Sequence, residues 1–264
     1  MSRETILDTI AARTQVRVKE AKEHRPLTEL RRQAEALSSN TGFPFTKALS
    51  GEDMSFICEV KKASPSKGII AEDFPYLSIA QEYQAAGAAA ISCLTEPYWF
   101  LGKDAYLQEI TSSLSIPVLR KDFTVDEYMI YEAKVLGASA ILLICSILDD
   151  GQLRAYQSLA AELGLSVLTE THDEQEINRA IKAGANILGV NNRNLKTFQV
   201  DFETTIRLRS QVPDDVLFIS ESGVKTPEDI ARLHAIGTNG VLIGETLMRA
   251  PDKKQMLDHL RSKL

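Results

Sequence analysis

The stretch VLFISES, residues 216–222, is a short apolar run that ends on the polar residues Glu221 and Ser222. Five other runs have the same form: SFICEVK (55–61), IPVLRK (116–121), LSVLTE (165–170), NILGVN (186–191) and GVLIGE (240–245). Apolar runs this short, separated by stretches of helical period, predict parallel strands that are buried on both faces. A (β/α)8 barrel carries its chemistry at the ends of such strands, so we expect an α/β TIM barrel that is an enzyme.

Glycine closes a helical stretch and precedes an apolar run at five places, which are Gly87, Gly137, Gly164, Gly184 and Gly237. A glycine just past a helix end takes the left-handed conformation that terminates the helix. The repeated βα unit predicts eight strands near residues 54–61, 89–94, 117–121, 140–146, 166–170, 186–191, 216–221 and 240–244. A doubly wound sheet is the alternative, but it more usually carries a G-x-G-x-x-G loop, which this sequence lacks.

The length of 264 residues fits one barrel of about 250 residues plus a short addition. We therefore expect a single domain over residues 1–264, of which about 1–50 form a helical N-terminal extension. Two apolar stripes at helical spacing support the extension: Ile6, Leu7 and Ile10, and then Leu27, Leu30, Ala34 and Leu37. We expect these helices to cap the barrel surface, and a lid that touches the ligand is the alternative.

Composition excludes several classes of protein. No apolar run approaches the roughly 18 residues of a membrane span, and the N-terminal MSRET has no apolar signal region. The net charge of −6 provides no long-range attraction to nucleic acid. Cys58, Cys93 and Cys145 fall within predicted strands, where reduced thiols behave as small hydrophobic groups, so we expect a cytoplasmic protein. We expect a monomer, with a weak homo-oligomer as the alternative.

A protein-built metal site is not expected. The four histidines are scattered, and neither His-x-His nor Cys-x-x-Cys spacing occurs. His172 closely follows a predicted strand, and we interpret it as a solvated loop residue.

Charged residues at the strand ends are the candidates for catalysis. Glu59 and Lys61 are two residues apart, so they share one face of a strand and meet in the barrel mouth. A structural ion pair is the alternative interpretation. It is weakened because polar residues end four further strands, namely Lys121, Glu170, Asn191, Glu221 and Ser222.

Two loops favour a phosphate site. Ser222-Gly223 follows the seventh strand and Gly244-Glu245 follows the eighth. Barrels commonly bind phosphate through backbone N–H groups of these loops, and glycine lets the main chain approach the oxygens. The segment SPSKG, residues 64–68, has the composition of a mobile flap after the first strand.

Seven motifs together resemble indole-3-glycerol phosphate synthase, and they occur in the order of that family. They are EVKKASPSKG (59–68), LTEPYWF (94–100), LRKDF (119–123), LTE (168–170), GVNNRNL (189–195), SESG (220–223) and LIGETLMR (242–249). The resemblance covers the chain from the first strand to the last, and the helical extension also suits the family. Because one helical stretch follows the last strand, no fused phosphoribosylanthranilate isomerase is expected.

The resemblance implies ring closure of 1-(2-carboxyphenylamino)-1-deoxyribulose 5-phosphate to indole-3-glycerol phosphate, with loss of carbon dioxide and water and without a cofactor. It implies that Lys121 is the general acid that polarises the ribulose carbonyl. Glu170, aided by Glu59, would handle protons in the dehydration, while Lys61 would bind substrate anions and is the other candidate for the dehydration acid.

The remaining site residues carried over from the family bind substrate. Asn191, Arg193, Glu221 and Ser222 would orient hydroxyls and the carboxylate, and Phe100, Phe123 and Leu142 would sandwich the anthranilate ring. Ser64, Gly223, Gly244 and the N–H of Glu245 would bind phosphate. Some relatives have serine in place of Glu245, so we expect its carboxylate to point away from the phosphate.

Two other functions remain open. A Schiff-base aldolase of the same fold would use Lys61 or Lys121 as nucleophile. A non-catalytic module that binds phosphosugars would need only the phosphate loops, and it gives no reason to keep Glu59, Lys121 and Glu170 together.

For the enzyme, we expect a neutral charge cluster at the mouth, with Lys61, Lys121 and Arg193 facing Glu59, Glu170 and Glu221.

Overall fold

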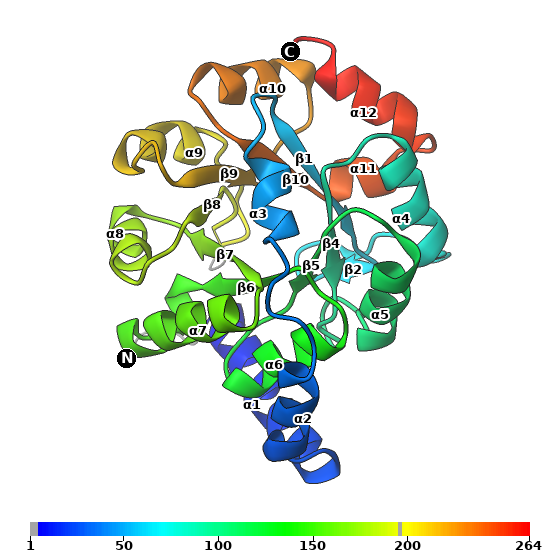
Figure 1. The fold of residues 1–264 in the computed structure, drawn as a ribbon. Helices are drawn as coiled ribbons and strands as arrows, with labels where there is room; N and C mark the ends of the chain where they lie inside the picture. The colour runs from blue at the N-terminus through cyan, green and yellow to red at the C-terminus, as the bar shows by residue number, and fades with distance from the viewer. Residues whose placement is uncertain (1–4, 195–196) are drawn as a thin grey trace.

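The computed structural model describes residues 5–194 and 197–264, so residues 1–4 and Leu195 of the motif GVNNRNL lie outside the described part. Within it, eight parallel strands close into a barrel in the order β1-β10-β9-β8-β7-β6-β5-β4 (Figure 1). These strands are β1 Ser55–Val60, β4 Ala90–Leu94, β5 Val118–Lys121, β6 Ala140–Ile144, β7 Ser166–Thr171, β8 Ile187–Asn191, β9 Leu217–Glu221 and β10 Gly240–Ile243. The predicted (β/α)8 fold is confirmed.

Helices follow the strands and surround the barrel (Figure 1). They are α4 Tyr76–Ala85, α5 Asp104–Ser113, α6 Glu127–Val135, α7 Asp150–Glu162, α8 Glu174–Lys182, α9 Glu203–Leu208, α10 Pro227–Ala235, α11 Glu245–Arg249 and α12 Lys253–Arg261, with 3₁₀ turns at Cys145–Ile147 and Arg209–Gln211. The five predicted helix-closing glycines all have positive φ, between 71° and 90°. A short antiparallel hairpin, β2 Ala63–Ser64 and β3 Gly68–Ile69, follows β1.

Each strand alternates between the barrel interior and the helix layer, as its two-residue period requires. Ile57, Leu119, Leu168 and Ile219 belong to the inner apolar cluster of the barrel. Their neighbours Phe56 and Cys58 on β1 belong to the outer cluster beneath the helices. The barrel interior is therefore filled by apolar side chains.

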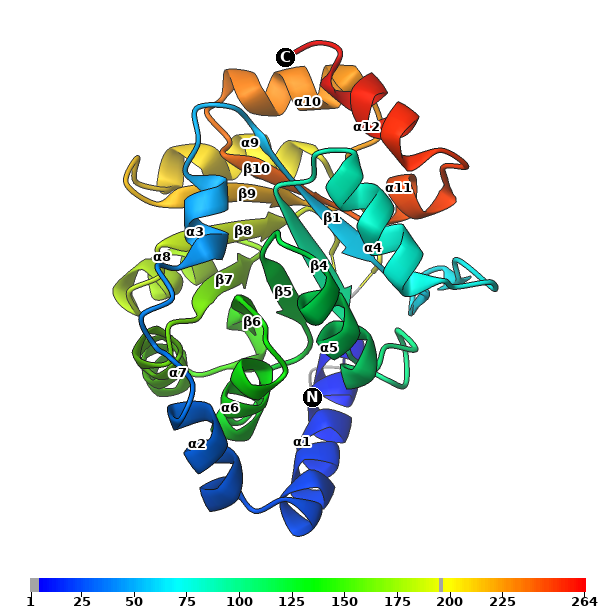
Figure 2. The same ribbon diagram turned by 45° about the vertical axis from the view of Figure 1, so that its right-hand side comes forward.

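Three helices precede the barrel: α1 Ile6–His24, α2 Leu27–Glu35 and α3 Pro44–Leu49. Figure 2 shows α1 and α3 on different sides of the barrel. Phe45 and Leu49 of α3 are fully buried in the inner cluster, and Thr46 bonds to Ser166 at the start of β7. This helix therefore closes the end of the barrel where the strands begin.

The other two helices of the extension have different roles. α2 packs on α6 through Leu30 and Ala34, as the predicted stripe requires. Leu37 does not continue that stripe, because it lies beyond the end of α2 and is 46% exposed. α1 buries Leu7 and Ile10 against the inner cluster at the opposite end of the barrel.

One prediction about the cysteines is wrong in detail. Cys145 lies in the 3₁₀ turn after β6, because the strand ends at Ile144. All three thiols are nevertheless buried and unpaired. Across residues 5–194 and 197–264, we find no helix with the length and apolar character that a membrane crossing requires.

Candidate active site

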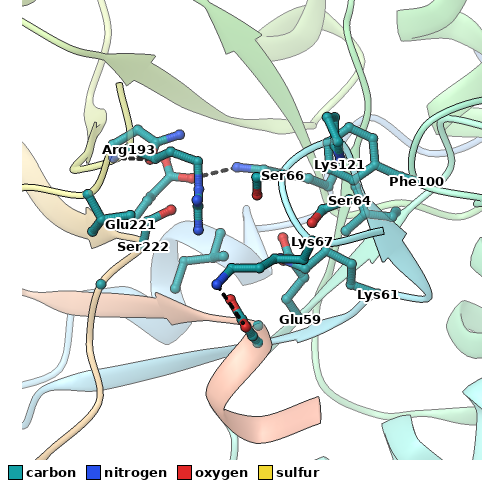
Figure 3. Close-up of a pocket in the computed structure, with 18 of the residues that line it drawn as sticks. Glu59, Lys61, Ser64, Ser66, Lys67, Phe100, Lys121, Arg193, Glu221 and Ser222 are labelled. Atoms are coloured by element: carbon teal, nitrogen blue, oxygen red, sulfur yellow. Dashed lines mark hydrogen bonds and ion pairs between the residues drawn. The ribbon is translucent and has the colours of Figure 1, made fainter. Parts of the chain in front are cut away.

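A cavity of about 730 Å³ opens at the carboxyl ends of the strands, within the usual size range of small-molecule sites. All fifteen residues that the sequence predicts for the site line it: Glu59, Lys61, Ser64, Phe100, Lys121, Phe123, Leu142, Glu170, Asn191, Arg193, Glu221, Ser222, Gly223, Gly244 and Glu245. They come from every strand end of the barrel, and Figure 3 shows part of the set around one pocket.

Lys121 ends β5 and lies between two buried carboxylates. Its Nζ is 2.5 Å from Glu221 Oε2 and 3.2 Å from Glu170 Oε2. Burial alone would lower the pKa of Lys121, but the charges of Glu221 and Glu170 raise it above its usual value. The ammonium group is therefore held protonated in a site that is almost closed to solvent.

The two carboxylates beside Lys121 have different environments. Burial alone would raise the pKa of Glu170, but the charges of Lys121 and His172 and a hydrogen bond from Asn191, which donates to Glu170 Oε1 at 3.2 Å, lower it. Burial raises the pKa of Glu221 to about 7, although Lys121 opposes the shift. Glu221 Oε1 is buried without a hydrogen-bond partner among the described residues. Glu170 is thus the ionised carboxylate of the pair, and Glu221 titrates near neutral pH.

Glu59 and Lys61 meet in the mouth as expected and form an ion pair, with Nζ 2.5 Å from Glu59 Oε1. Lys61 is not on the strand as predicted, since β1 ends at Val60. Ser92 on β4 also donates to Glu59, at 3.4 Å. Lys61 therefore begins the loop that leads into the β2–β3 hairpin.

The expected neutral cluster is divided into two separate groups. Lys61 pairs with Glu59, and Lys121 pairs with Glu170 and Glu221. Within the described part of the chain, Arg193 forms no ion pair, and its Nη1 donates instead to the carbonyl of Phe198. Arg193 therefore remains a cation that an anionic ligand can engage.

The predicted phosphate residues come from three loops on one side of the cavity. Ser64 lies in the hairpin, Gly223 follows β9 with φ of 93°, and Gly244 follows β10. The Glu245 carboxylate lies 3.1 Å from Arg249 Nε and 3.5 Å from Lys67 Nζ. Although burial raises the pKa of Glu245, these two cations lower it, so this carboxylate is neutralised by its own partners.

An apolar wall faces the charged residues. The rings of Phe100 and Phe123 have centroids 6.0 Å apart, and Leu142 is buried beside them. Ile6, Leu7 and Ile10 of α1 also line the cavity. The extension therefore does more than cap the surface as expected, because α1 forms part of the wall of the site.

Two residues that support the site were not identified from the sequence. Glu96 is fully buried and accepts backbone N–H bonds from Tyr98, Trp99 and Phe100, which fixes the loop that carries the aromatic wall. His172 was interpreted as solvated, and that interpretation is wrong. Its side chain is 19% exposed, and its Nε2 lies 3.4 Å from Glu170 Oε1.

Among residues 5–194 and 197–264, no group of three or more His, Cys, Asp or Glu side chains has the arrangement of metal ligands.

Comparison with known proteins agrees with the geometry. Residues 7–260 match the family model described as indole-3-glycerol phosphate synthase. The chain is 54% identical to the indole-3-glycerol phosphate synthase of Ruminiclostridium cellulolyticum, over 97% of this chain and 98% of the relative. It is 52% identical to the protein of the same name from Endomicrobium trichonymphae, over 97% and 99% of the two chains.

A solved structure of 3-hexulose-6-phosphate synthase from Salmonella typhimurium shares the fold. It covers 80% of this chain and 98% of its own, with a TM-score of 0.66 and 14% identity. That likeness concerns the barrel alone. The family match and the relatives extend over nearly the whole chain, and this chain therefore belongs to the indole-3-glycerol phosphate synthase family.

Proposed function

We propose that the cavity converts 1-(2-carboxyphenylamino)-1-deoxyribulose 5-phosphate into indole-3-glycerol phosphate, the tryptophan-pathway reaction of its family, and that Lys121 is the central acid. The observation that carries this assignment is the buried Lys121 ammonium between Glu170 and Glu221. An acidic proton and a fixed positive charge are both needed where an alkoxide develops as the new carbon–carbon bond forms.

In the first step, the aromatic carbon attacks the ribulose carbonyl carbon, and Lys121 donates its proton to the carbonyl oxygen. Loss of the carboxylate as carbon dioxide then restores the aromatic ring. The raised pKa of Lys121 keeps it charged until the substrate arrives, and the apolar wall excludes water that would weaken its field.

The hydroxyl formed in the ring closure leaves as water in the second step, the dehydration. Glu170 handles protons in this step, because it lies beside Lys121 and Asn191 at the base of the cavity. Glu59 and Lys61 form a second pair that assists, with Lys61 as the other candidate for the acid. Asn191, Arg193, Glu221 and Ser222 orient the hydroxyls and the carboxylate.

The substrate lies across the cavity with its two ends in different surroundings. Phe100, Phe123 and Leu142 hold the anthranilate ring, while Ser64, Gly223, Gly244 and the N–H of Glu245 bind the phosphate. Aromatic and apolar side chains suit the anthranilate ring, and backbone N–H donors suit the phosphate. The three buried, unpaired thiols support a reducing compartment such as the cytoplasm.

The charge state of Lys121 favours this function over a Schiff-base aldolase. A lysine nucleophile must be neutral, and such enzymes lower its pKa, whereas two carboxylates raise the pKa of Lys121. Incubating the protein with the carboxyphenylamino-ribulose phosphate should release a product with indole fluorescence. Absence of that product, or trapping of substrate on Lys121 by borohydride, would contradict the proposal.

Activity should not depend on a divalent metal. The proposed steps need only proton donors and fixed charges, which the side chains of the cavity supply. We expect turnover in excess EDTA to equal turnover in untreated buffer. Loss of turnover in EDTA, followed by recovery on addition of Mg²⁺ or Zn²⁺, would show that a metal takes part.

Replacing Gly244 by alanine should damage both the phosphate loop and the Glu59–Lys61 pair. A Cβ at this position would collide with Glu59 Oε1 and lie 2.8 Å from Lys61 Nζ. Both atoms are the ends of flexible side chains that can move aside, so we expect the Glu59–Lys61 pair to be displaced and kcat/KM to fall about tenfold, with little change in stability. Gly51→Ala is the matched control, because nothing lies within 4 Å of its Cβ position. Equal kcat/KM in the two variants would refute the role given to Gly244.

A further inference from the structure

His172 stands directly behind Glu170, outside the set of described residues that line the cavity. It follows the last residue of β7, so its side chain starts at the same strand end as the site. Its Nε2 lies 3.4 Å from Glu170 Oε1. On the other side of the ring, Nδ1 lies 3.1 Å from Glu176 Oε2.

Glu176 fixes the orientation of the imidazole. The same Oε2 also accepts the backbone N–H of His172 at 2.9 Å, so this carboxylate holds both the main chain and the ring. Nδ1 therefore carries a proton that it donates to Glu176, and Nε2 must face Glu170. Nε2 is buried and has no hydrogen-bond partner among the described residues.

One proton accounts for the contact between Nε2 and Glu170. If the proton is on Nε2, an imidazolium faces a carboxylate. If it is on Glu170, a carboxylic acid donates to a neutral imidazole. If Nε2 and Glu170 were both protonated, two donors would face each other. If neither were protonated, the Nε2 lone pair would face a carboxylate. Both of those states are disfavoured.

The proposed reaction needs such a proton. The substrate carboxylate leaves as neutral carbon dioxide, so each turnover takes up one proton from solution. The hydroxyl leaves as water only if it is protonated. In the resting site, however, Glu170 accepts from Lys121 and Asn191, which favours the ionised carboxylate. A carboxylate alone has no proton to give.

We propose that His172 is a positioning residue that holds Glu170 and stores the proton that Glu170 delivers in the dehydration. This inference rests on the proposed function. The proton moves from Nε2 to Glu170 Oε1, and Glu170 donates it to the leaving hydroxyl, so the C–O bond breaks and water forms. The adjacent carbon loses its proton to Lys121, which gave up a proton in the ring closure, and the C=C bond of the indole ring forms. After product leaves, Glu170 takes up one proton from bulk solvent, and this proton returns to Nε2.

The groups around His172 set the direction of its pH dependence. Burial alone would lower its pKa, but the Glu176 hydrogen bond and the charges of Glu170, Glu176 and Glu221 raise it above the usual value. From the neighbouring turn, Cys145 donates to the Glu176 carbonyl, and Arg179 on α8 is neutralised by Asp150 on α7. The proton is therefore stored below the His172 pKa and is lost as pH rises through it, so kcat should fall on the alkaline side.

The test compares three variants over a range of pH, with product followed by indole fluorescence. His172→Gln keeps an amide near the Nε2 position but holds no transferable proton. We expect kcat to fall about tenfold, which is less than the 10²–10⁴-fold loss caused by removing a direct proton donor. KM should be unchanged, and the fall of kcat at alkaline pH that is due to His172 should disappear. Glu176→Gln removes an acceptor that raises the His172 pKa, so the alkaline limb should move to lower pH.

The exposed His259 supplies the control, because His259→Gln changes the same residue type far from the site and should match wild type. Wild-type kcat in His172→Gln would overturn the inference. So would a lower kcat with an unchanged alkaline limb, because a merely structural role would leave the pH profile intact.

A measurement without turnover separates this inference from the proposed function. Histidine side-chain NMR should show a lower His172 pKa in Glu170→Gln than in wild type, with the His259 signal as an internal reference. If wild type forms no product but the shift is present, the proposed function fails while the His172–Glu170 contact stands. If the His172 pKa is the same in both proteins, the inference fails whatever the enzyme does.

Discussion

Lys121→Met should lower kcat by about 10² to 10⁴ or more while changing KM much less. Methionine keeps much of the length and bulk of the side chain but has neither proton nor charge. The lost interaction is made mainly with the developing alkoxide, so its loss affects the transition state more than substrate binding. Steady-state kinetics by indole fluorescence measures both constants.

The same change also removes the cation shared by Glu170 and Glu221. Both carboxyl groups are buried, so their pKa values should rise and the fold should lose stability. Lys121→Arg separates the two effects, because arginine keeps the charge but does not act as a proton donor near neutral pH. We expect Lys121→Arg to unfold at a higher temperature than Lys121→Met and yet to remain far less active than wild type. If folded Lys121→Met turns over within a few-fold of wild type, Lys61 becomes the central acid.

The fold could be predicted because its determinants are local. Gly87 and Gly137 end helices through their own φ angles, and a buried parallel strand is recognisable from a few consecutive apolar residues. The site residues could be located for the same reason. A polar residue whose side chain points inward at the carboxyl end of a barrel strand reaches the mouth, whatever the rest of the chain does.

The supporting residues could not be predicted, because their partners are set by tertiary packing. His172 is polar, follows a strand and stands next to Asp173, and these features are equally typical of a solvated loop. Its burial depends on how α8 packs on the barrel and on the rotamer of Glu176. The contribution of α1 to the cavity wall is similar, because the apolar stripe of Ile6, Leu7 and Ile10 does not specify which surface it covers.

On β5, one of two neighbouring charged residues could be identified from the sequence and the other could not. Lys121 points into the mouth and was identified, whereas Arg120 points outward and was not. Arg120 is 3% exposed, and its guanidinium donates to Asp104 at 2.8 Å, Glu132 at 2.7 Å, Thr95 Oγ1 at 3.2 Å and the Met129 carbonyl at 3.0 Å. It thus ties β5 to the loop after β4 and to α5 and α6, and so fixes the strand that presents Lys121.

Arg120→Met should therefore destabilise the protein by about 3–5 kcal/mol, because it leaves carboxylates at Asp104, Asp122 and Glu132 without their buried cation. Burial already raises the pKa of Asp104, and without the opposing charge of Arg120 it would rise further, so the folded protein would bind more protons than the unfolded chain. Stability would fall as pH rises, and the deficit should be smaller at pH 5 than at pH 8.

Urea unfolding at the two pH values measures this loss, and Arg31→Met is the matched control. Arg31 also pairs with a glutamate at 2.7 Å, but that pair is exposed on α2, where solvent screens it, so its loss should barely change stability. If Arg120→Met loses no more stability than Arg31→Met, the buried network does not stabilise β5 as argued. A large loss in Arg120→Met alone would show that the position of Lys121 depends on a cation from the opposite face of its own strand.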